Sequence, residues 1–405
     1  MYKNLSHETA HPPISWDEGE TTHSCRWRSE KGLLPPKKLI IADDTLTADE
    51  AYRVACEGTG IIWRGDFQNA KQLLQAMSRR ADKPSKKSIR SQKSSKSKQE
   101  GIIPLAVPMS EIFHKHRLTQ SQRSRTLGML LIQVNPDHTI PLRRALDVSQ
   151  ACLAVYGAVT EPYVMSLRDL LGFIGSLEWR KNGMALDALK DLGDGRIHPH
   201  YGVFAPVRSE YIGLLEKAPF PASINKQSLA FDIGTGTGVL AAVLAKRGIQ
   251  KIVATDQDER AIECATENIE GLGIGKQVKL MQTNLFPEGQ APLIICNPPW
   301  VPARPSSPIE YAVYDPDSQM LKGFLAGLKD HLSPEGEGWL ILSDLAEHLG
   351  LRTRAELLSW IEAAGLKVLG RNDVRPTHIK ALDTQDPLYR ARAAEVTSLW
   401  RLGAA

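Results

Sequence analysis

The stretch FDIGTGTG, at residues 231–238, decides the fold that we expect for the second half of the chain. It continues the apolar run LAF, at residues 229–231, and precedes the apolar run VLAAVLA, so it lies where a buried strand turns into a helix. Glycines at such a turn let a ligand approach backbone N–H groups closely. The stretch therefore predicts a nucleotide-like ligand at the end of the first strand of an α/β sheet.

The spacing of the glycines indicates which ligand. Dinucleotide dehydrogenases place G-x-G-x-x-G at this turn, whereas this chain has G-x-G-x-G with Val239 at the third glycine position. A carboxylate before the loop can accept a hydrogen bond from a ligand's ammonium group, directly or through water, but repels a pyrophosphate; the alternative is a carboxylate that caps the turn. Spacing and charge favour S-adenosylmethionine over NAD. The expected cofactor-binding residues of the loop are Asp232, Gly234, Thr235, Gly236 and Gly238.

Strands and helices alternate from this stretch to the C-terminus. Strand patterns at 251–256, 278–282, 292–297 and 338–343 are separated by helix patterns at 238–248, 258–273 and 318–332, with a further helix pattern at 354–365. Two more strand patterns, at 366–371 and 395–402, close the chain. This order predicts a doubly wound, mostly parallel sheet of the Rossmann-like class I methyltransferase type.

Two further positions are candidate cofactor contacts because each follows a predicted strand. Asp256 lies where a carboxylate chelates two ribose hydroxyls in nucleotide-binding folds. Asn284 could accept from an adenine amino group, with Leu285 or Phe286 covering the ring. A turn carboxylate and a polar loop with a core phenylalanine are the structural alternatives.

The tetrapeptide Asn297-Pro298-Pro299-Trp300, after the fourth predicted strand, indicates the chemistry. Two prolines stiffen the chain at the carboxyl edge of the sheet. An amide or aromatic amine is a poor nucleophile, because its lone pair is delocalised, and it must be held so that the pair points at the methyl donor. The oxygen of Asn297 and the carbonyl of Pro298 could accept the two N–H groups, while Trp300 stacks on the planar group. We expect these four residues to be catalytic, and Asn297 to border the cofactor.

Together, the motifs FDIGTGTG, VATDQDE, TNLF and ICNPPW resemble those of the HemK/PrmC-type glutamine N5-methyltransferases and their relatives among the adenine N6-methyltransferases. The resemblance covers about residues 200–345. It implies that Gly234, Gly236, Asp256 and Asn284 contact S-adenosylmethionine and that Asn297, Pro298 and Trp300 hold the target nitrogen. It also implies that the segment with Pro206, Arg208 and Glu210 covers the methionine end of the cofactor. The chain departs from the glutamine enzymes at Trp300, where tyrosine is usual, and at Asn284, where an acidic residue is common.

The first half of the chain carries no such motif. We expect a loose arm at 1–36, a mostly helical domain at 37–190 and the methyltransferase domain at 191–405. A Lys- and Ser-rich insertion at about 79–101 lacks the apolar residues that a packed structure needs. Its core, 79–98, has nine basic residues and one acidic residue, a net charge of +8 in a chain of net charge +4. The insertion is either a solvated linker or a site of nucleic-acid contact.

Composition limits the remaining possibilities. The five cysteines are scattered, which argues against a disulfide framework and a zinc cluster, and no apolar run is long enough to span a bilayer. We therefore expect a cytoplasmic protein with no membrane contact. The histidine pairs at 114–116 and 198–200 lack a third ligand in a recognisable pattern, so no metal is predicted.

The sequence predicts an S-adenosylmethionine-dependent N-methyltransferase whose partner is a macromolecular methyl acceptor. The leading hypothesis is a protein glutamine side chain. The alternative is N6 methylation of adenine in RNA or DNA, which poses the same geometric problem. A further alternative is a binding module that has kept the methyltransferase fold without the activity.

Overall fold

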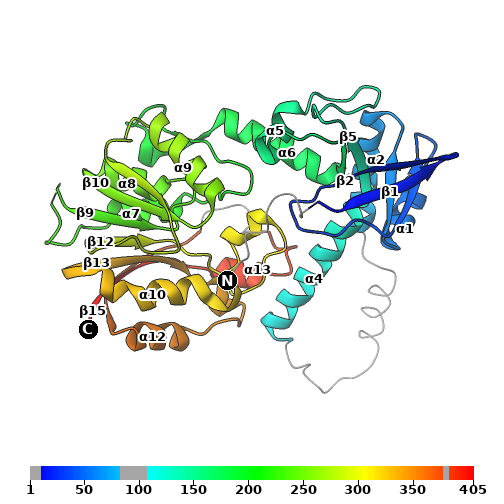
Figure 1. The fold of residues 1–405 in the computed structure, drawn as a ribbon. Coiled ribbons are helices and arrows are strands. Elements are labelled where there is room, and N and C mark those ends of the chain that lie inside the picture. The colour runs from blue at the N-terminus through cyan, green and yellow to red at the C-terminus, as the bar shows by residue number, and fades with distance from the viewer. Residues whose placement is uncertain (1–10, 83–106, 226, 377–382) are drawn as a thin grey trace, which may run out of the picture. The chain divides into compact units, whose positions relative to one another are not determined.

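The computed structural model describes residues 11–82, 107–225, 227–376 and 383–405 (Figure 1). The chain forms two compact units. Unit 1 comprises Met1–Val107 and His114–Leu177, and unit 2 comprises Pro108–Phe113 and Glu178–Ala405. No helix among the described residues is both long and apolar enough to cross a membrane.

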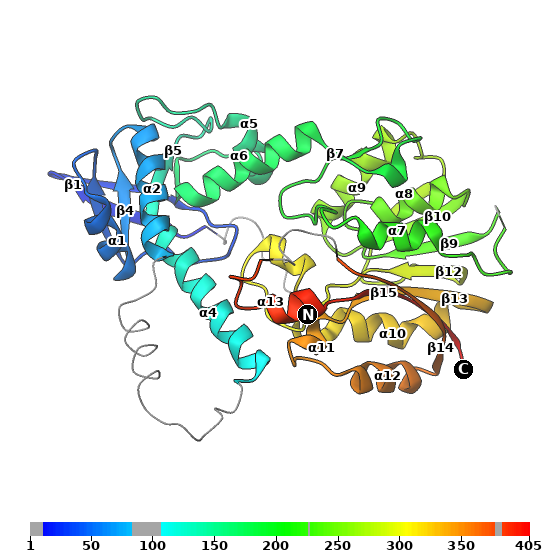
Figure 2. The same ribbon diagram turned by 180° about the vertical axis from the view of Figure 1, so that it is seen from behind.

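Unit 2 is built on a seven-stranded sheet whose strand order is β11-β10-β9-β12-β13-β15-β14 (Figure 2). The strands from β11 to β13 run parallel to one another, and β15 is antiparallel to both β13 and β14. The predicted class I methyltransferase fold is confirmed, including its terminal β-pair. The strands are β9 Leu229–Ile233, β10 Lys251–Asp256, β11 Val278–Gln282, β12 Ala291–Cys296, β13 Leu332–Ser343, β14 Leu366–Val374 and β15 Thr397–Ala404.

Helices cover both faces of this sheet. Because side chains alternate along a strand, Ala230 joins a core with helices α7 to α9, whereas Phe231 joins a second core with α10 and α12. Burial on both faces explains why the central strands are continuous apolar runs. The helices are α7 Glu210–Lys217, α8 Val239–Lys246, α9 Glu259–Gly271, α10 Gln319–His331, α11 Leu345–His348, α12 Arg354–Ala363 and α13 Tyr389–Ala394.

Unit 1 is not mostly helical, contrary to our expectation. Six strands form one sheet in the order β1-β2-β6-β5-β4-β3, in which β3, β4 and β5 are parallel. Its elements are β1 Pro13–Glu18, β2 Thr21–Trp27, β3 Lys38–Ala42, α1 Ala48–Cys56, β4 Thr59–Trp63, α2 Phe67–Ala81, β5 Leu130–Val134, α5 Ser149–Tyr156, β6 Tyr163–Ser166 and most of α4 Met109–Leu127 and α6 Leu167–Asn182.

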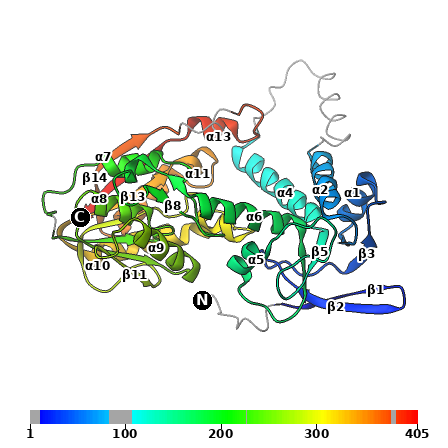
Figure 3. The same ribbon diagram turned by 90° about the horizontal axis from the view of Figure 1, so that it is seen from above.

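Two local errors explain this difference. Residues 11–27 are not a loose arm, because β1 and β2 form an antiparallel hairpin (Figure 3) whose Trp16 and Trp27 are buried. The stretch AYRVACEGTGIIWR, at residues 51–64, was expected to form a single helix. It instead divides into the end of α1 and strand β4, since the chain turns at Gly58 with a φ of 82° before the apolar run TGIIW. Short apolar runs do not distinguish a strand from a buried helix by periodicity alone.

The division of the chain also differs from the prediction. The units divide between Leu177 and Glu178, rather than near residue 190. The physical reason is that Leu186 and Leu189 are buried in the core beside α7 and α8. This region holds β7 Met184–Ala185, the short helix Asp187–Leu189 and β8 Arg196–Ile197. The expected insertion begins inside helix α2, since Arg79 and Arg80 belong to its last turn, and residues 83–101 lie outside the described residues.

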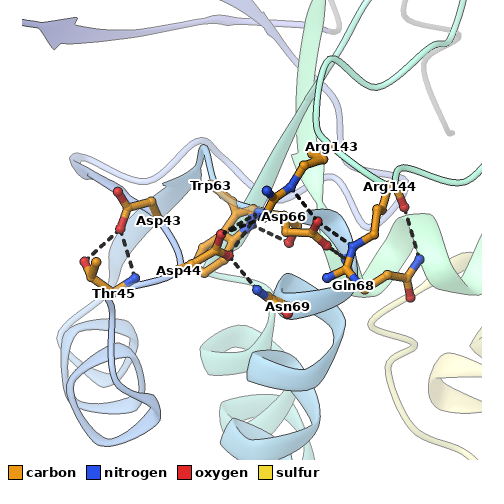
Figure 4. Close-up of polar contacts among 9 residues, drawn as sticks. All are labelled: Asp43, Asp44, Thr45, Trp63, Asp66, Gln68, Asn69, Arg143 and Arg144. Carbon is orange, nitrogen blue, oxygen red and sulfur yellow. Dashed lines mark hydrogen bonds and ion pairs between the residues drawn. The ribbon is translucent and has the colours of Figure 1, made fainter.

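A carboxylate network joins the carboxyl ends of β3 and β4 in unit 1 (Figure 4). Asp66 begins helix α2 and accepts hydrogen bonds from the backbone N–H of Gln68 and from the side chains of Arg143 and Arg144. These contacts, led by that of Arg144, lower the pKa of Asp66 to about 2. Asp44 in turn accepts from the backbone N–H of Asp66. The network fixes the loop that precedes α2. None of its residues belongs to the motifs of unit 2.

Candidate active site

The central strands of unit 2 bring three predicted segments together at one edge of the sheet. β9 lies between β10 and β12, with Ile233 opposite Thr255 on one side and Cys296 on the other. The glycine loop, Asp256 and the Asn297–Trp300 loop therefore leave neighbouring strands at the same level. The carboxyl edge of a parallel sheet is where such folds bind ligands.

All three glycines of the loop adopt backbone conformations that other residues rarely adopt. The φ angles of Gly234, Gly236 and Gly238 are 71°, 55° and 81°. A methyl group added at Gly236 would meet no atom within 4 Å, whereas one at Gly234 would collide with the side chain of Met320. The loop thus keeps open space above Gly236, as a ligand that approaches the backbone requires.

Asp232 lies beneath this loop and is fully buried. Its Oδ2 accepts hydrogen bonds from the Thr235 hydroxyl at 2.6 Å and from the backbone N–H of Ala241 at 3.0 Å. Its Oδ1 is buried and has no hydrogen-bond partner among the described residues. Burial raises the pKa of this carboxyl group to about 6. One oxygen therefore caps the turn, as the alternative reading supposed, and the other remains available to a donor.

Asp256 is held against the glycine loop. Its Oδ2 accepts from the backbone N–H of Gly236 at 3.0 Å, and its Oδ1 accepts from the backbone N–H of Asp258. Burial raises the pKa of Asp256. The third predicted segment joins it, because the backbone N–H of Thr283 donates to the carbonyl of Asp256.

Asn284 and Leu285 follow in this segment. The side chain of Asn284 is exposed. Leu285 has a φ of 63°, and its carbonyl accepts from the Thr255 hydroxyl at 2.6 Å. Phe286 stacks between Phe324 and His331, which matches the core phenylalanine of the structural alternative.

The tetrapeptide after β12 contains a hydrogen bond that the sequence did not predict. The indole Nε1–H of Trp300 donates to Oδ1 of Asn297 at 2.8 Å. Pro298 is buried, and Asn297, Pro299 and Trp300 are half-buried. Since a carbonyl oxygen has two lone pairs, Asn297 keeps the capacity to accept one further N–H.

Two residues ahead of β9 hold the Trp300 ring. Tyr211 meets it edge-on, with ring centroids 6.4 Å apart and an interplanar angle of 88°. The guanidinium carbon of Arg208 lies 5.5 Å from its centroid. Burial, with a contribution from the Asp232 charge, raises the pKa of the Tyr211 phenol. Tyr211 thus lies near both Asp232 and the Asn297–Trp300 loop, which we call the target loop.

Arg208 was predicted from the resemblance to cover the cofactor, but its guanidinium also forms a bidentate ion pair with Glu395, at 3.1 and 2.9 Å. Pro206 is buried, and Glu210 is the first residue of α7. Tyr211 lies in this same segment, but the resemblance did not single it out. Nothing in the sequence pattern signalled Glu395, because it belongs to no motif and is remote in the chain.

The chain after Trp300 is fastened to the start of α10. Val301 pairs with Tyr314, and the backbone N–H of Asp315 donates to the carbonyl of Val301 at 2.9 Å. The buried carboxylate of Asp315 accepts from the N–H groups of Met320 and Leu321. Met320 also lies against Gly234. The start of α10 therefore contacts both the target loop and the glycine loop.

Both histidines of the pair at 198–200 make polar contacts within unit 2. His200 contacts Glu267 at 2.8 Å, and His198 contacts Asp194 at 3.2 Å and the carbonyl of Arg180 at 2.7 Å. Among the residues described, no group of three or more His, Cys, Asp or Glu side chains is arranged to hold a metal ion. All five cysteines are free thiols.

Comparisons with known proteins agree on one class. Residues 212–298 match the family model described as ribosomal protein L11 methyltransferase (PrmA). The chain is 33% identical over 199 residues to a release factor glutamine methyltransferase of Cereibacter sphaeroides, which covers 46% of this chain and 65% of the relative. It is 38% identical over 86 residues to a ribosomal protein L11 methyltransferase of Pelotomaculum thermopropionicum, covering 21% of this chain and 26% of the relative.

The chain thus spans less than two thirds of the length of these curated relatives. Among solved structures, a methyltransferase from Pyrococcus furiosus is 18% identical, with a TM-score of 0.39 over 58% of this chain and 99% of that one. The sheet order shows that unit 2 has the class I methyltransferase fold, and its sequence is similar to those of methyltransferases.

We expect Asp232→Asn to change how stability depends on pH. The folded-state pKa of about 6 lies above the ordinary value of about 3.9, so the folded protein binds more protons than the unfolded chain between these values. The contribution of Asp232 to the free energy of unfolding therefore falls as the pH rises from about 4 to about 6, and stays low above that. In urea unfolding, the variant should gain about 1 kcal/mol relative to wild type between about pH 5 and about pH 8. An equal difference at both pH values would contradict this assignment.

Proposed function

We propose that the protein transfers the methyl group of S-adenosylmethionine to a planar nitrogen, with a protein glutamine side chain as the leading acceptor. One observation carries the proposal: the pairing of β12 with β9 places the Asn297–Trp300 loop next to the glycine loop, since Cys296 lies opposite Ile233. A methyl donor on one loop and a target nitrogen on the other would then be neighbours.

The residues of the glycine loop fit the expected cofactor. The unpartnered Oδ1 of Asp232 is a buried acceptor suited to an ammonium group. The open space at Gly236 admits a ligand close to the backbone, and Asp256 lies beside it to accept from ribose hydroxyls. Asn284 is exposed and Leu285 follows it in the chain, so that both could contact an adenine ring. When bound, S-adenosylmethionine supplies an electrophilic methyl group on a sulfonium centre.

The tetrapeptide supplies orientation rather than a strong base. The remaining lone pair of Asn297 Oδ1 and the carbonyl of Pro298 would accept the N–H groups of the target, which fixes the direction of its nitrogen. Trp300 would stack on the planar group, and Pro298 and Pro299 keep the loop from adapting to other geometries. Fixing these groups in advance is where most of the catalytic effect is expected to arise.

Two acceptors satisfy this chemistry. A glutamine side chain is supported by the relative named release factor glutamine methyltransferase and by the order of motifs. Adenine N6 in RNA or DNA is supported by Trp300, whose indole offers a larger stacking surface for a flipped base than the tyrosine usual in the glutamine enzymes. We place glutamine first because both curated relatives are named as methyltransferases of a protein.

Substitutions in the two loops should separate binding from transfer. We expect Asn297→Ala to leave the affinity for S-adenosylhomocysteine within about twofold of wild type and to lower the transfer rate by at least roughly 10²-fold, because it removes an orienting acceptor. Asp256→Ala should instead weaken the affinity by roughly tenfold or more, because it removes a predicted ribose contact. Calorimetry gives the affinity, and incorporation of labelled methyl groups gives the rate.

Each variant serves as the control for the other, since both lie at carboxyl ends of neighbouring strands. Equal losses of affinity and of rate in the two variants would contradict the division between a cofactor loop and a target loop.

The acceptor class is tested by incubating the protein with labelled S-adenosylmethionine and extract from cells that lack it. Labelled product is then divided between protease and nuclease treatment. Loss of macromolecular label to protease, with N5-methylglutamine in the acid-free digest, is the expected result. Loss of label to nuclease would replace glutamine with a nucleic-acid acceptor. Absence of any incorporation by a protein that is folded would contradict the proposed activity.

A further inference from the structure

The buried carboxylate of Glu395 is linked to the target loop through Arg208. Glu395 follows helix α13 and precedes β15, and its side chain is 1% exposed. Its two oxygens accept from the two terminal nitrogens of Arg208, and Oε1 also accepts from the Ser343 hydroxyl at 2.7 Å. Ser343 is fixed in turn, because its Oγ accepts from the backbone N–H of Leu345 at 3.0 Å.

This arrangement determines where the Arg208 guanidinium lies. A bidentate pair of this kind fixes both the position and the plane of the guanidinium group. The same guanidinium lies 5.5 Å from the centre of the Trp300 ring, within the range at which a cation is attracted to an aromatic face. Trp300 is held on another side by Tyr211 and at its Nε1 by Asn297.

We propose that Glu395 is a positioning residue for methyl transfer, which acts through Arg208 to set the orientation of the Trp300 ring and, through the indole N–H, of the Asn297 acceptor. The inference rests on the proposed function for its kinetic consequence, but its structural part stands apart from it. Without the Glu395 charge, Arg208 loses its fixed position, and the ring and the Asn297 amide lose the support that keeps them in one geometry.

The chain provides a closely matched control elsewhere in the same sheet. Glu337 is also buried, forms a bidentate pair with Arg401, and accepts from the indole N–H of Trp339 at 2.9 Å. Arg208 and Arg401 are equally exposed, at 25% of their side-chain surface. Glu337 lies opposite Leu293, toward the end of β12 that is remote from Asn297. Loss of the Glu337 charge should lower the stability of the protein without changing the conformation of the target loop.

The experiment compares Glu395→Gln with Glu337→Gln in the full-length protein. The first readout needs no acceptor: the near-ultraviolet circular dichroism of Trp300, obtained as the difference between each protein and its own Trp300→Phe form. We expect Glu395→Gln to lose at least about half of this signal and Glu337→Gln to retain it. Retention of the full signal in Glu395→Gln would overturn the proposal, whatever the enzymatic activity proves to be.

The second readout is kinetic and uses labelled S-adenosylmethionine with extract from cells that lack the protein. Glu395→Gln should lower the rate of incorporation roughly tenfold or more while S-adenosylhomocysteine binds with unchanged affinity. Glu395→Asp, which keeps the charge, should recover part of the rate. Equal losses in Glu395→Gln and Glu337→Gln would reduce Glu395 to a structural residue. If the wild type transfers no methyl group, the proposed activity fails, and the circular dichroism still decides the positioning.

Discussion

The structure of the candidate site depends on the pairing of β9 with β10 on one side and β12 on the other. This register puts Ile233, Thr255 and Cys296 at one level, so that the glycine loop, Asp256 and the Asn297–Trp300 loop begin at the same edge. The buried Asp232 then ties the glycine loop to the start of α8 through Thr235 and Ala241. Burial raises the pKa of the Cys296 thiol, and the charges of Asp232, Asp315 and Asp256 raise it further.

Much of unit 2 could be predicted because its signals are local. A buried parallel strand is a continuous apolar run, and a loop with three positive-φ positions requires glycine at each, so the strands and the cofactor loop are visible in the order of residues. The same holds for the Asn297–Trp300 loop, whose prolines have few structural explanations at a sheet edge. The structure places these segments together, and their individual contacts with a ligand stay predictions.

The remainder depends on contacts between residues far apart in the chain. Arg208 and Glu395 are 187 positions apart, and no spacing rule connects them. The hydrogen bond from Trp300 to Asn297 is local, but the Trp300 ring also contacts Tyr211 and Arg208, which come before β9 in the chain. In unit 1, β4 was taken as part of a helix because short apolar segments fit a strand and a buried helix equally well, and only pairing with neighbouring strands decides between them.

In the proposed function, the glycine loop and the Asn297–Trp300 loop form one site for a methyl donor and a nitrogen acceptor. A crystal structure of the protein with S-adenosylhomocysteine tests this most directly. We predict that the ribose contacts Asp256, that the amino group faces Asp232 Oδ1, and that the sulfur faces the Asn297 side chain. A ligand bound away from the carboxyl edge of β9, or one whose sulfur faces away from Asn297, would contradict it.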